Sequence, residues 1–281
     1  MRLATIIEDG EASVAVVQGD RVLPIGRELA FGSMRAIAGG GEPALRRITA
    51  WAAGQPDAAY RSLDAVELGP AVPDPGAIYT VGLNYRTSAE AEPSDPGRPM
   101  IYGKAVSSVT AQQATVTWDR TLTANVDPEC ELGIVIGAEA FAVSPAQAMA
   151  HVFGYTCMND ISSRDPWLDG DQWLLGKSMP GFCPVGPWIV TRDELSVDDL
   201  RLGCTINGVA IQDGSTAQMR HRVPEIVSYL SHHVKLSPGD LIASGTPARL
   251  GGPLGPERHL EGGDVVTVWI ERIGELTTLI T

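Results

Sequence analysis

Three acidic side chains in the sequence have a spacing that could hold a metal ion. Glu129 and Glu131 are separated by one residue and lead into the apolar run 132–136. The two-residue period of a strand puts both carboxylates on one face and Cys130 on the other. Two like charges this close are tolerated if both are exposed to water, or if a divalent cation lies between them.

A third carboxylate favours the metal. Asp160 ends a second apolar segment, residues 153–159. Together Glu129, Glu131 and Asp160 offer only oxygen ligands, which suit Mg²⁺ or Mn²⁺. Zn²⁺ would need nitrogen or sulfur ligands, which this set lacks. Such a triad would suit one of these ions, with open positions for water or substrate oxygens, and the alternative of exposed carboxylates stays open.

The basic residues give a weaker signal. Lysine occurs only as Lys104, Lys177 and Lys235, and the other 18 of the 21 basic residues are arginine. Where arginine is the usual cation, a retained lysine can mark a position that needs a compact, titratable ammonium. The scarcity of lysine is therefore a hint that some of these three positions carry chemistry.

The elements that must position these residues are mostly short strands. Turn signals separate strands expected at 3–7, 12–17 and 21–23, and a helix is expected at 43–55 after the break Gly39-Gly40-Gly41. Beyond a Pro- and Gly-rich linker around 69–76, strands are expected at 77–81, 131–136, 188–190, 240–244 and 265–270, with helices at 146–152 and 224–232. This pattern predicts a mixed β-rich α+β protein, with a small N-terminal domain over 1–70 and a larger domain over 71–281.

Composition narrows the range of partners. The 281-residue chain has a formal net charge of −13 and no cluster of basic residues, which argues against nucleic acid. The sequence contains no apolar run long enough for a membrane-spanning helix, and acidic residues interrupt any signal-peptide pattern at the start. The four cysteines form no CxxC pair, so we expect reduced thiols. These features predict a cytoplasmic protein with no membrane or nucleic-acid partner.

Several motifs taken in order resemble the fumarylacetoacetate hydrolase family. They are Gly82-Leu83-Asn84-Tyr85, Glu129-x-Glu131, Gly154-Tyr155-Thr156-x-x-Asn159-Asp160-x-Ser162-x-Arg164-Asp165, Gly176-Lys177-Ser178, Pro184-x-Gly186-Pro187, Gln212-Asp213, and Pro238-Gly239-Asp240 through Gly245-Thr246-Pro247. The resemblance runs from about the linker to the C-terminus. Within this family, the chain resembles acylpyruvases and 2-hydroxyhepta-2,4-diene-1,7-dioate isomerases.

The resemblance implies a β-sandwich roll, a homodimer, and Mg²⁺ or Mn²⁺ held by Glu129, Glu131 and Asp160. The implied substrate is a small anionic 2-oxo or 2,4-dioxo acid, whose enolate the metal would stabilise. Lys177 would face the enolate oxygen and Arg164 would orient a substrate carboxylate, so both are expected to be catalytic as well as substrate-binding. Tyr85 and Thr246 would complete the substrate site.

One departure bears on the reaction. Family hydrolases usually carry a histidine three residues after the tyrosine and a glutamate three further on, which together activate water. Here Ser88 and Ala91 take these positions, and serine has no proton affinity near neutral pH. Glu90 or Glu92 could act instead if burial raised its pKa. Trp167 and Pro180 also replace a frequent glutamine and a frequent acidic residue.

Three functions follow. The first is hydrolysis of a C–C bond in an acylpyruvate-like acid, which needs a base to replace the missing histidine. The second is enolate chemistry without attack by water, namely isomerisation, tautomerisation or decarboxylation. The third is a binding protein that retains the enzyme's site without its activity. We expect the hydrolase.

Overall fold

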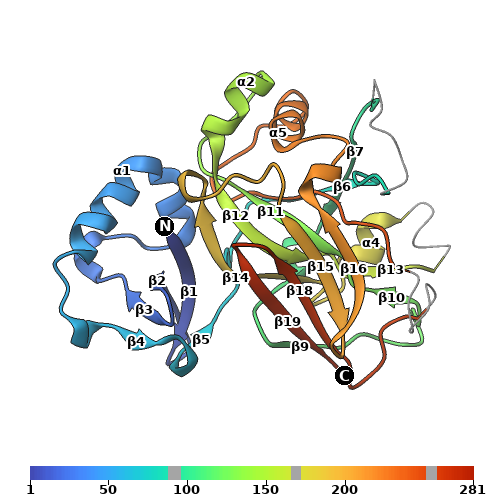
Figure 1. The fold of residues 1–281 in the computed structure, drawn as a ribbon, viewed down its shortest axis with the longest axis horizontal. Coiled ribbons are helices and arrows are strands. Elements are labelled where there is room, and N and C mark those ends of the chain that lie inside the picture. Colours follow the sequence, from blue (N-terminus) through green and yellow to red (C-terminus); the bar gives the residue numbers. More distant parts are fainter. Residues whose placement is uncertain (88–95, 166–171, 251–257) are drawn as a thin grey trace.

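The fold is described by a computed structural model that covers residues 1–87, 96–165, 172–250 and 258–281. Its first part contains a β meander and the longest helix (Figure 1). The elements there are β1 Arg2–Glu8, β2 Glu11–Gln18, β3 Arg21–Pro24, α1 Met34–Ala52, β4 Arg61–Ser62 and β5 Glu67–Leu68, with 3₁₀ turns at Arg27–Leu29, Asp57–Ala59 and Leu63–Ala65.

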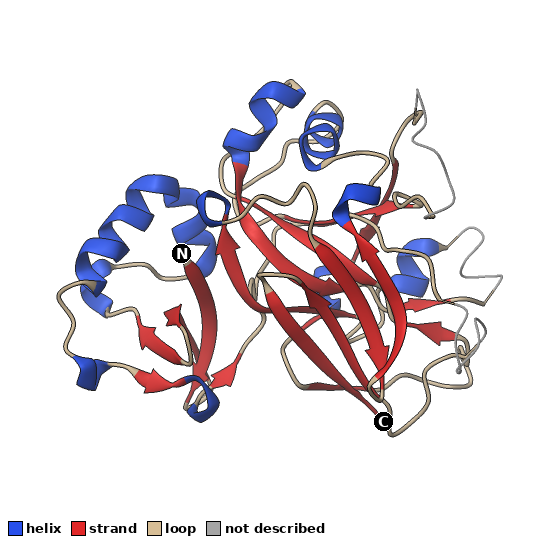
Figure 2. Ribbon diagram, in the orientation of Figure 1, coloured by secondary structure: helices blue, strands red, loops and turns tan. Residues whose placement is uncertain are grey.

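The second part is built mainly of strands (Figure 2). The strands are β6 Ile78–Gly82, β7 Met100–Lys104, β8 Val109–Thr110, β9 Ala114–Val116, β10 Val126–Asp127, β11 Cys130–Ile136, β12 Val152–Asn159, β13 Ser162–Ser163, β14 Cys183–Thr191, β15 Arg201–Ile206, β16 Val209–Ser215, β17 Leu241–Ala243, β18 Val265–Ile270 and β19 Gly274–Ile280. The helices are α2 Pro145–Ala148, α4 Trp173–Lys177 and α5 Val223–Ser231, with 3₁₀ turns at Val106–Ser108, Met149–His151, Arg192–Glu194 and Thr216–Gln218. The expected mixed, sheet-rich α+β class is confirmed.

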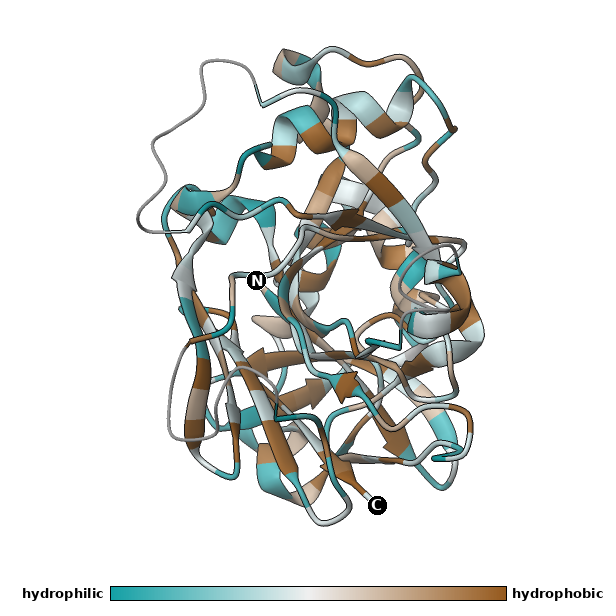
Figure 3. Cartoon of the chain, turned by 90° about the vertical axis from the view of Figure 1, so that its right-hand side faces the viewer, coloured by the Kyte–Doolittle hydropathy of each residue, from teal (hydrophilic) through white to brown (hydrophobic). Residues whose placement is uncertain are grey.

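Two large sheets form the frame of the molecule. The longer has the order β4-β3-β2-β1-β14-β12-β11-β17-β6-β7, and the shorter has the order β16-β15-β18-β19-β9. The two sheets pack face to face where β11, β12 and β14 meet β15, β18 and β19. The apolar residues between them, among them Leu132, Ile134, Val268 and Leu276, are fully buried. Figure 3 shows hydrophobic stretches along strands in the lower half of the view, alternating with paler, more polar residues.

The N-terminal meander continues the longer sheet. Strand β1 pairs with β14 through Arg2↔Val190 and Leu3↔Ile189. A second apolar cluster therefore draws residues from both parts, with Leu3 and Ile37 in the same cluster as Ile189. The expected meander is confirmed, and a domain boundary at residue 70 stays a prediction.

Two expected boundaries were wrong. Helix α1 begins at Met34, where the Ser33 hydroxyl accepts the N–H of Ala36 at 3.1 Å, and it ends at Ala52. The glycines do not start the helix but interrupt it at Gly41, whose φ of 52° breaks the α geometry. The strand expected at 188–190 is also longer, because β14 extends through Pro184 and Pro187, residues that usually indicate a turn.

Two further observations concern the cysteines and the helices. All four cysteines are buried free thiols. The described part of the chain contains no helix with the length and apolar character needed to cross a membrane. The buried polar residues are therefore the features that need a functional explanation.

Candidate active site

All the site residues expected from the sequence line one cavity. The cavity has a volume of about 330 Å³ and lies in the second part of the chain. Its lining includes all seven predicted residues, namely Tyr85, Glu129, Glu131, Asp160, Arg164, Lys177 and Thr246. This size is typical of a site for a small molecule.

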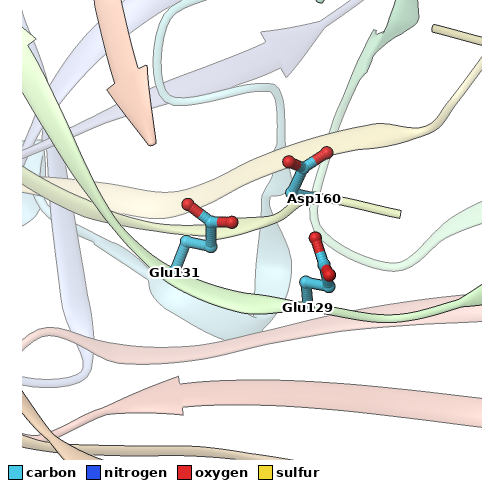
Figure 4. Close-up of side chains that lie close together, drawn as sticks. All are labelled: Glu129, Glu131 and Asp160. Carbon is cyan, nitrogen blue, oxygen red and sulfur yellow. The ribbon is translucent and has the colours of Figure 1, made fainter. Parts of the chain in front are cut away.

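Strand pairing brings the three carboxylates together. Strands β11 and β12 are antiparallel with Cys130 opposite Asn159, so the start of one strand lies beside the end of the other. The N–H of Asp160 donates to the carbonyl of Glu129 at 2.9 Å, which extends this register by one residue. Glu131 on β11 and Glu129, just before this strand begins, lie close to Asp160 (Figure 4). Ligand oxygens of the three residues all lie within 4.8 Å of one another, and all three residues are buried.

The loop after β17 forms a second wall beside the triad. Because β17 pairs with β11, the chain from Ser244 onward passes next to Glu131, and the N–H of Gly245 donates to Glu131 Oε2 at 2.6 Å. Gly245 has a φ of 95°, and a Cβ there would lie 2.7 Å from Asn84 Cβ, so the approach requires glycine. The hydroxyl of Thr246 donates to the carbonyl of Cys130 at 2.8 Å.

Two buried lysines neutralise part of this negative charge. Lys177, at the end of α4, donates to Glu129 Oε2 at 2.9 Å, to Asp160 Oδ2 at 2.8 Å and to Ser162 Oγ at 2.6 Å. Lys104, at the end of β7, contacts the other oxygen of Asp160 at 2.5 Å, and its side chain is 0% exposed. Lys235, by contrast, pairs with Glu139 on the surface. Two of the three lysines singled out by their scarcity therefore lie against the carboxylates.

A group of three basic side chains surrounds Asp127 next to the triad. Arg164 Nε donates to Asp127 Oδ2 at 3.2 Å, and a terminal nitrogen of Arg164 also contacts Glu129. Arg249 Nη1 donates to Asp127 Oδ1 at 2.8 Å, and His259 Nδ1 lies 2.8 Å from the same oxygen. Asp127 thus fixes two guanidinium groups that line the cavity.

Burial and neighbouring charges push the pKa values of the two glutamates in opposite directions. Burial would raise the pKa of Glu129, but the charges of Lys177 and Arg164 outweigh burial and lower that pKa to about 2. The pKa of Glu131 is raised well above its usual value, first by burial and then by the charges of Asp160 and Glu129. Burial opposes the charged form of Lys177, yet the three carboxylates raise its pKa.

These residues fit a hard divalent cation. The donor set contains oxygen only, and carboxylate oxygens have further lone pairs for a metal besides the N–H groups they accept. Among the described residues Glu131 accepts a backbone N–H but forms no direct ion pair. A divalent cation between the carboxylates would stabilise the charged form of Glu131, which the protein alone leaves unfavourable.

Tyr85 is a largely buried residue of the cavity lining. It is 8% exposed, and burial raises the pKa of its hydroxyl well above the usual value. The preceding Asn84 holds this segment in place, since its side-chain amide donates to the carbonyls of Ser244 and His221. Tyr85 therefore lines the cavity with its hydroxyl neutral, and the hydroxyl oxygen itself is buried.

The sequence reasoning did not identify several cavity residues. The cavity residues are Arg249, which pairs with Asp127, the stacked rings of Tyr102 and Trp173, and Gln212, whose side chain fixes Thr246 at 2.8 Å. Lys104, which contacts Asp160, was also not identified as a site residue. Lysine scarcity was a usable signal for Lys104, and Gln212 lies in a quoted motif. No local pattern indicated Arg249, because only the fold brings it to Asp127.

Most positions considered where this chain departs from family hydrolases lie outside the described residues. They are Ser88, Glu90, Ala91 and Glu92, all within 88–95, and Trp167 likewise falls within 166–171. The differences from family residues at Ser88, Ala91 and Trp167 therefore rest on the sequence alone.

Known proteins resemble this chain over most of its length. The family described as "Fumarylacetoacetate (FAA) hydrolase C-terminal" matches residues 77–281. An uncharacterized protein of Staphylococcus aureus strain USA300 is 39% identical over 220 residues, which is 78% of this chain and 73% of that protein. An uncharacterized protein of Staphylococcus haemolyticus is 38% identical over 81% of this chain and 76% of its own length.

Solved structures show the same fold. A fumarylacetoacetate hydrolase from Exiguobacterium antarcticum has a TM-score of 0.89 at 31% identity, covering 100% of this chain and 99% of its own. A maleylpyruvate hydrolase from Sphingobium sp. SYK-6, solved with manganese(II) and pyruvate, has a TM-score of 0.82 at 25% identity, covering 100% and 99%. A 2-hydroxyhepta-2,4-diene-1,7-dioate isomerase from Mycobacterium marinum has a TM-score of 0.77 at 29% identity, covering 100% and 98%. With its matched family region, its shared fold and its carboxylate triad, this chain belongs to the fumarylacetoacetate hydrolase family.

Proposed function

We propose that this protein is a divalent-metal-dependent enzyme that hydrolyses a C–C bond in an acylpyruvate-like 2,4-dioxo acid. The observation that carries this proposal is the buried triad Glu129, Glu131 and Asp160 with Lys177 at 2.8–2.9 Å from two of its members, all lining one cavity. Such a cluster stabilises the fold poorly, because each buried charge loses its hydration. Its arrangement suits a reaction in which negative charge develops on a substrate oxygen.

The triad would hold Mg²⁺ or Mn²⁺, which when bound polarises a substrate carbonyl and favours its enolate. Lys177 donates all three of its N–H groups, two to carboxylates and one to the neutral Ser162 hydroxyl. A substrate oxyanion is a stronger acceptor than a hydroxyl, so it would replace Ser162 as the third partner. Lys177 would thereby stabilise the enolate of pyruvate as it leaves the acyl group.

Three other groups would orient the substrate. Arg164 is held by Asp127 and Glu129 at the cavity wall, where its guanidinium can bind a carboxylate. Thr246 is fixed by Gln212 and Cys130, and Tyr85 lines the same cavity. In the hydrolysis, water adds to the 4-carbonyl carbon, the bond between carbons 3 and 4 breaks, and a proton restores pyruvate from its enolate.

A second candidate is isomerisation or decarboxylation through the same enolate. Of the described residues that line the cavity, none is a histidine, and Ser88 stands where family hydrolases carry one. Such reactions need no activated water, so they do not require the missing base. The fold neighbour from Mycobacterium marinum is named as an isomerase, which keeps this candidate open to test.

Product analysis distinguishes these functions. Protein loaded with Mg²⁺ or Mn²⁺ is incubated in D₂O with acetylpyruvate, and separately with oxaloacetate, and the products are followed by NMR. Hydrolysis yields acetate and pyruvate from acetylpyruvate. Deuterium exchange without cleavage, or CO₂ release from oxaloacetate alone, would replace the hydrolase with the second candidate. Absence of any reaction with both acids would contradict both.

The variant Ser88→His tests whether only the base differs from family hydrolases. We expect hydrolysis of acetylpyruvate to increase at least about tenfold, toward the contribution of a positioned general base. The matched control is Ser88→Ala, which adds no base and should leave the rate unchanged. An equal rate in Ser88→His and Ser88→Ala would mean that this position does not limit hydrolysis.

A further inference from the structure

His259 is a histidine that lies one contact behind the cavity wall. Its Nδ1 lies 2.8 Å from Asp127 Oδ1, and its side chain is 29% exposed. The same carboxylate holds Arg164 and Arg249, which both line the cavity. The proposed reaction gives His259 no role, although a single carboxylate links it to two cations of the site.

The backbone on both sides of His259 is tied down. The N–H of Leu260 donates to the carbonyl of Val126 at 2.8 Å, on strand β10. Arg249 Nη2 donates to the carbonyl of Arg258 at 2.8 Å. The fold therefore holds the imidazole of His259 beside the end of β10, next to one of the cavity arginines.

The contact with Asp127 assigns the two ring nitrogens of His259. An ionised carboxylate only accepts hydrogen bonds, so Nδ1 carries the hydrogen and donates it to Asp127. The lone pair of the neutral imidazole is then on Nε2, which forms no hydrogen bond with any of the described residues. Because the side chain is partly exposed, Nε2 can take up a proton from water while the contact with Asp127 persists.

A proton on His259 would change the balance of charge at the cavity wall. The charged groups on its own segment and on the segments packed against it are Asp127, Arg164, Arg249, Arg120, Arg258, Glu261 and Asp264. Arg258 is paired with Asp264 at 2.8 Å, whereas one negative charge, on Asp127, is shared by two guanidinium groups. With a third cation on Asp127, less of each guanidinium charge is neutralised, so the wall becomes more attractive to an anion.

We propose that His259 is a positioning residue that takes up a proton at Nε2 and, through Asp127, strengthens the binding of the anionic substrate at Arg164. This inference rests on the proposed function, since that function places a substrate carboxylate at Arg164. Substrate affinity then rises as pH falls through the range between pH 8 and pH 5, in which histidine side chains ordinarily titrate. His259 does not touch the reacting atoms, so its proton changes KM and not kcat.

Pyruvate is a suitable probe, because its carboxylate keeps one negative charge throughout this range of pH. Calorimetry is done at pH 6 and pH 8 with Mn²⁺ saturating at both, so that metal binding by the triad does not limit the result. Pyruvate should bind about 3- to 10-fold more tightly at pH 6, the effect of one added charge at a partly hydrated site. Equal or weaker binding at pH 6, or no binding at either pH, overturns the inference.

Variants of His259 assign the pH response. In His259→Asn the amide nitrogen takes the place of Nδ1 and can still donate to Asp127, but no group gains a proton, so the response should be lost. His259→Lys is charged at both pH values and should bind pyruvate at pH 8 about 3- to 10-fold more tightly than the wild type does.

The matched control is His233→Asn, because His233 is an exposed histidine that contacts the carbonyl of Tyr229. This variant should keep the wild-type ratio of affinities at the two pH values. A wild-type ratio in His259→Asn would mean that the proton is taken up elsewhere. A loss of affinity in His259→Asn that is equal at pH 6 and pH 8 would mean that His259 only supports the structure. Either result overturns the inference.

Turnover separates this inference from the proposed function. If acetylpyruvate is cleaved, the ratio of KM between His259→Asn and the wild type should change with pH, while the ratio of kcat stays constant. If acetylpyruvate remains uncleaved but pyruvate binding shows the pH response and His259→Asn loses it, the proposed reaction fails and His259 keeps its role. If acetylpyruvate is cleaved and pyruvate affinity is equal at both pH values, the proposed function stands and the role of His259 fails.

Discussion

The ion pairs of the N-terminal part and those of the cavity differ in burial. Arg46 and Glu42 pair on helix α1 with side chains 63% and 81% exposed, whereas Lys104 and Asp160 pair with side chains 0% and 1% exposed. Both charges of an exposed pair stay hydrated, so the pair contributes little to stability. The charges of a buried pair lose their hydration, so apolar residues of similar volume in the same place often stabilise a fold equally well. Charges kept in the cavity despite this penalty therefore indicate function.

The largest expected effect breaks a buried pair. In Lys104→Met the aliphatic stem is kept, but the Asp160 oxygen that Lys104 contacts loses its cation. We expect the free energy of unfolding to fall by about 3 kcal/mol, because the buried Asp160 loses one of its two cations and keeps only Lys177. Denaturant unfolding measures this loss. The matched exposed variant Arg46→Met should change stability by less than about 0.5 kcal/mol, and similar losses in both would remove the distinction between the regions.

The next effect concerns activity. Lys177→Met removes the ammonium that faces Glu129, Asp160 and Ser162. We expect the kcat for the preferred 2-oxo acid to fall about 100- to 1000-fold, as when a donor to a developing oxyanion is removed. Steady-state kinetics with metal saturating measures it. Lys235→Met, at a surface pair, is the control and should keep full activity; an unaffected kcat in Lys177→Met would contradict the assigned role.

A smaller effect concerns how the stability conferred by the buried glutamates depends on pH. The pKa of Glu131 is raised in the native metal-free protein. This protein therefore holds a proton that the unfolded chain releases, and its free energy of unfolding falls as pH rises above the usual glutamate range. The pKa of Glu129 is lowered to about 2, so its contribution is present at neutral pH and is lost as pH falls toward that value. A bound divalent cation replaces the proton on Glu131. We expect the rise in Tm on adding Mn²⁺ to grow from about pH 5 to about pH 8.

Thermal unfolding with and without Mn²⁺ checks this expectation. Glu131→Gln has no carboxyl to titrate at this position, so its metal-free Tm should depend less on pH in the same range. A metal-induced rise in Tm that shrinks with increasing pH would contradict the account.

The sequence predicted the parts of the site that depend on local periodicity. The two-residue period placed Glu129 and Glu131 on one face, and the end of the next apolar segment located Asp160. Helix α5 and strand β18 also lie where patterning placed them. These features depend on residues close together in the chain, which is why a single sequence reveals them.

The rest depended on contacts between distant segments. Lys104 reaches Asp160 across 56 residues, and Arg249 reaches Asp127 across 122 residues. No spacing rule connects such pairs, because strand order brings them together. The misplaced start of α1 has a different cause, since Gly41 interrupts the helix without ending it and a glycine run usually indicates a break.

Metal titration of the wild-type protein and Glu131→Gln tests the central claim most directly. Mn²⁺ is titrated calorimetrically into metal-free protein, and circular dichroism confirms that both proteins have the same fold. The account predicts one binding site per chain in the wild type and at least about a 100-fold weaker affinity in the variant, because one of three carboxylate ligands is lost. Equal affinity in the two proteins would contradict the claim that this buried carboxylate triad holds the metal.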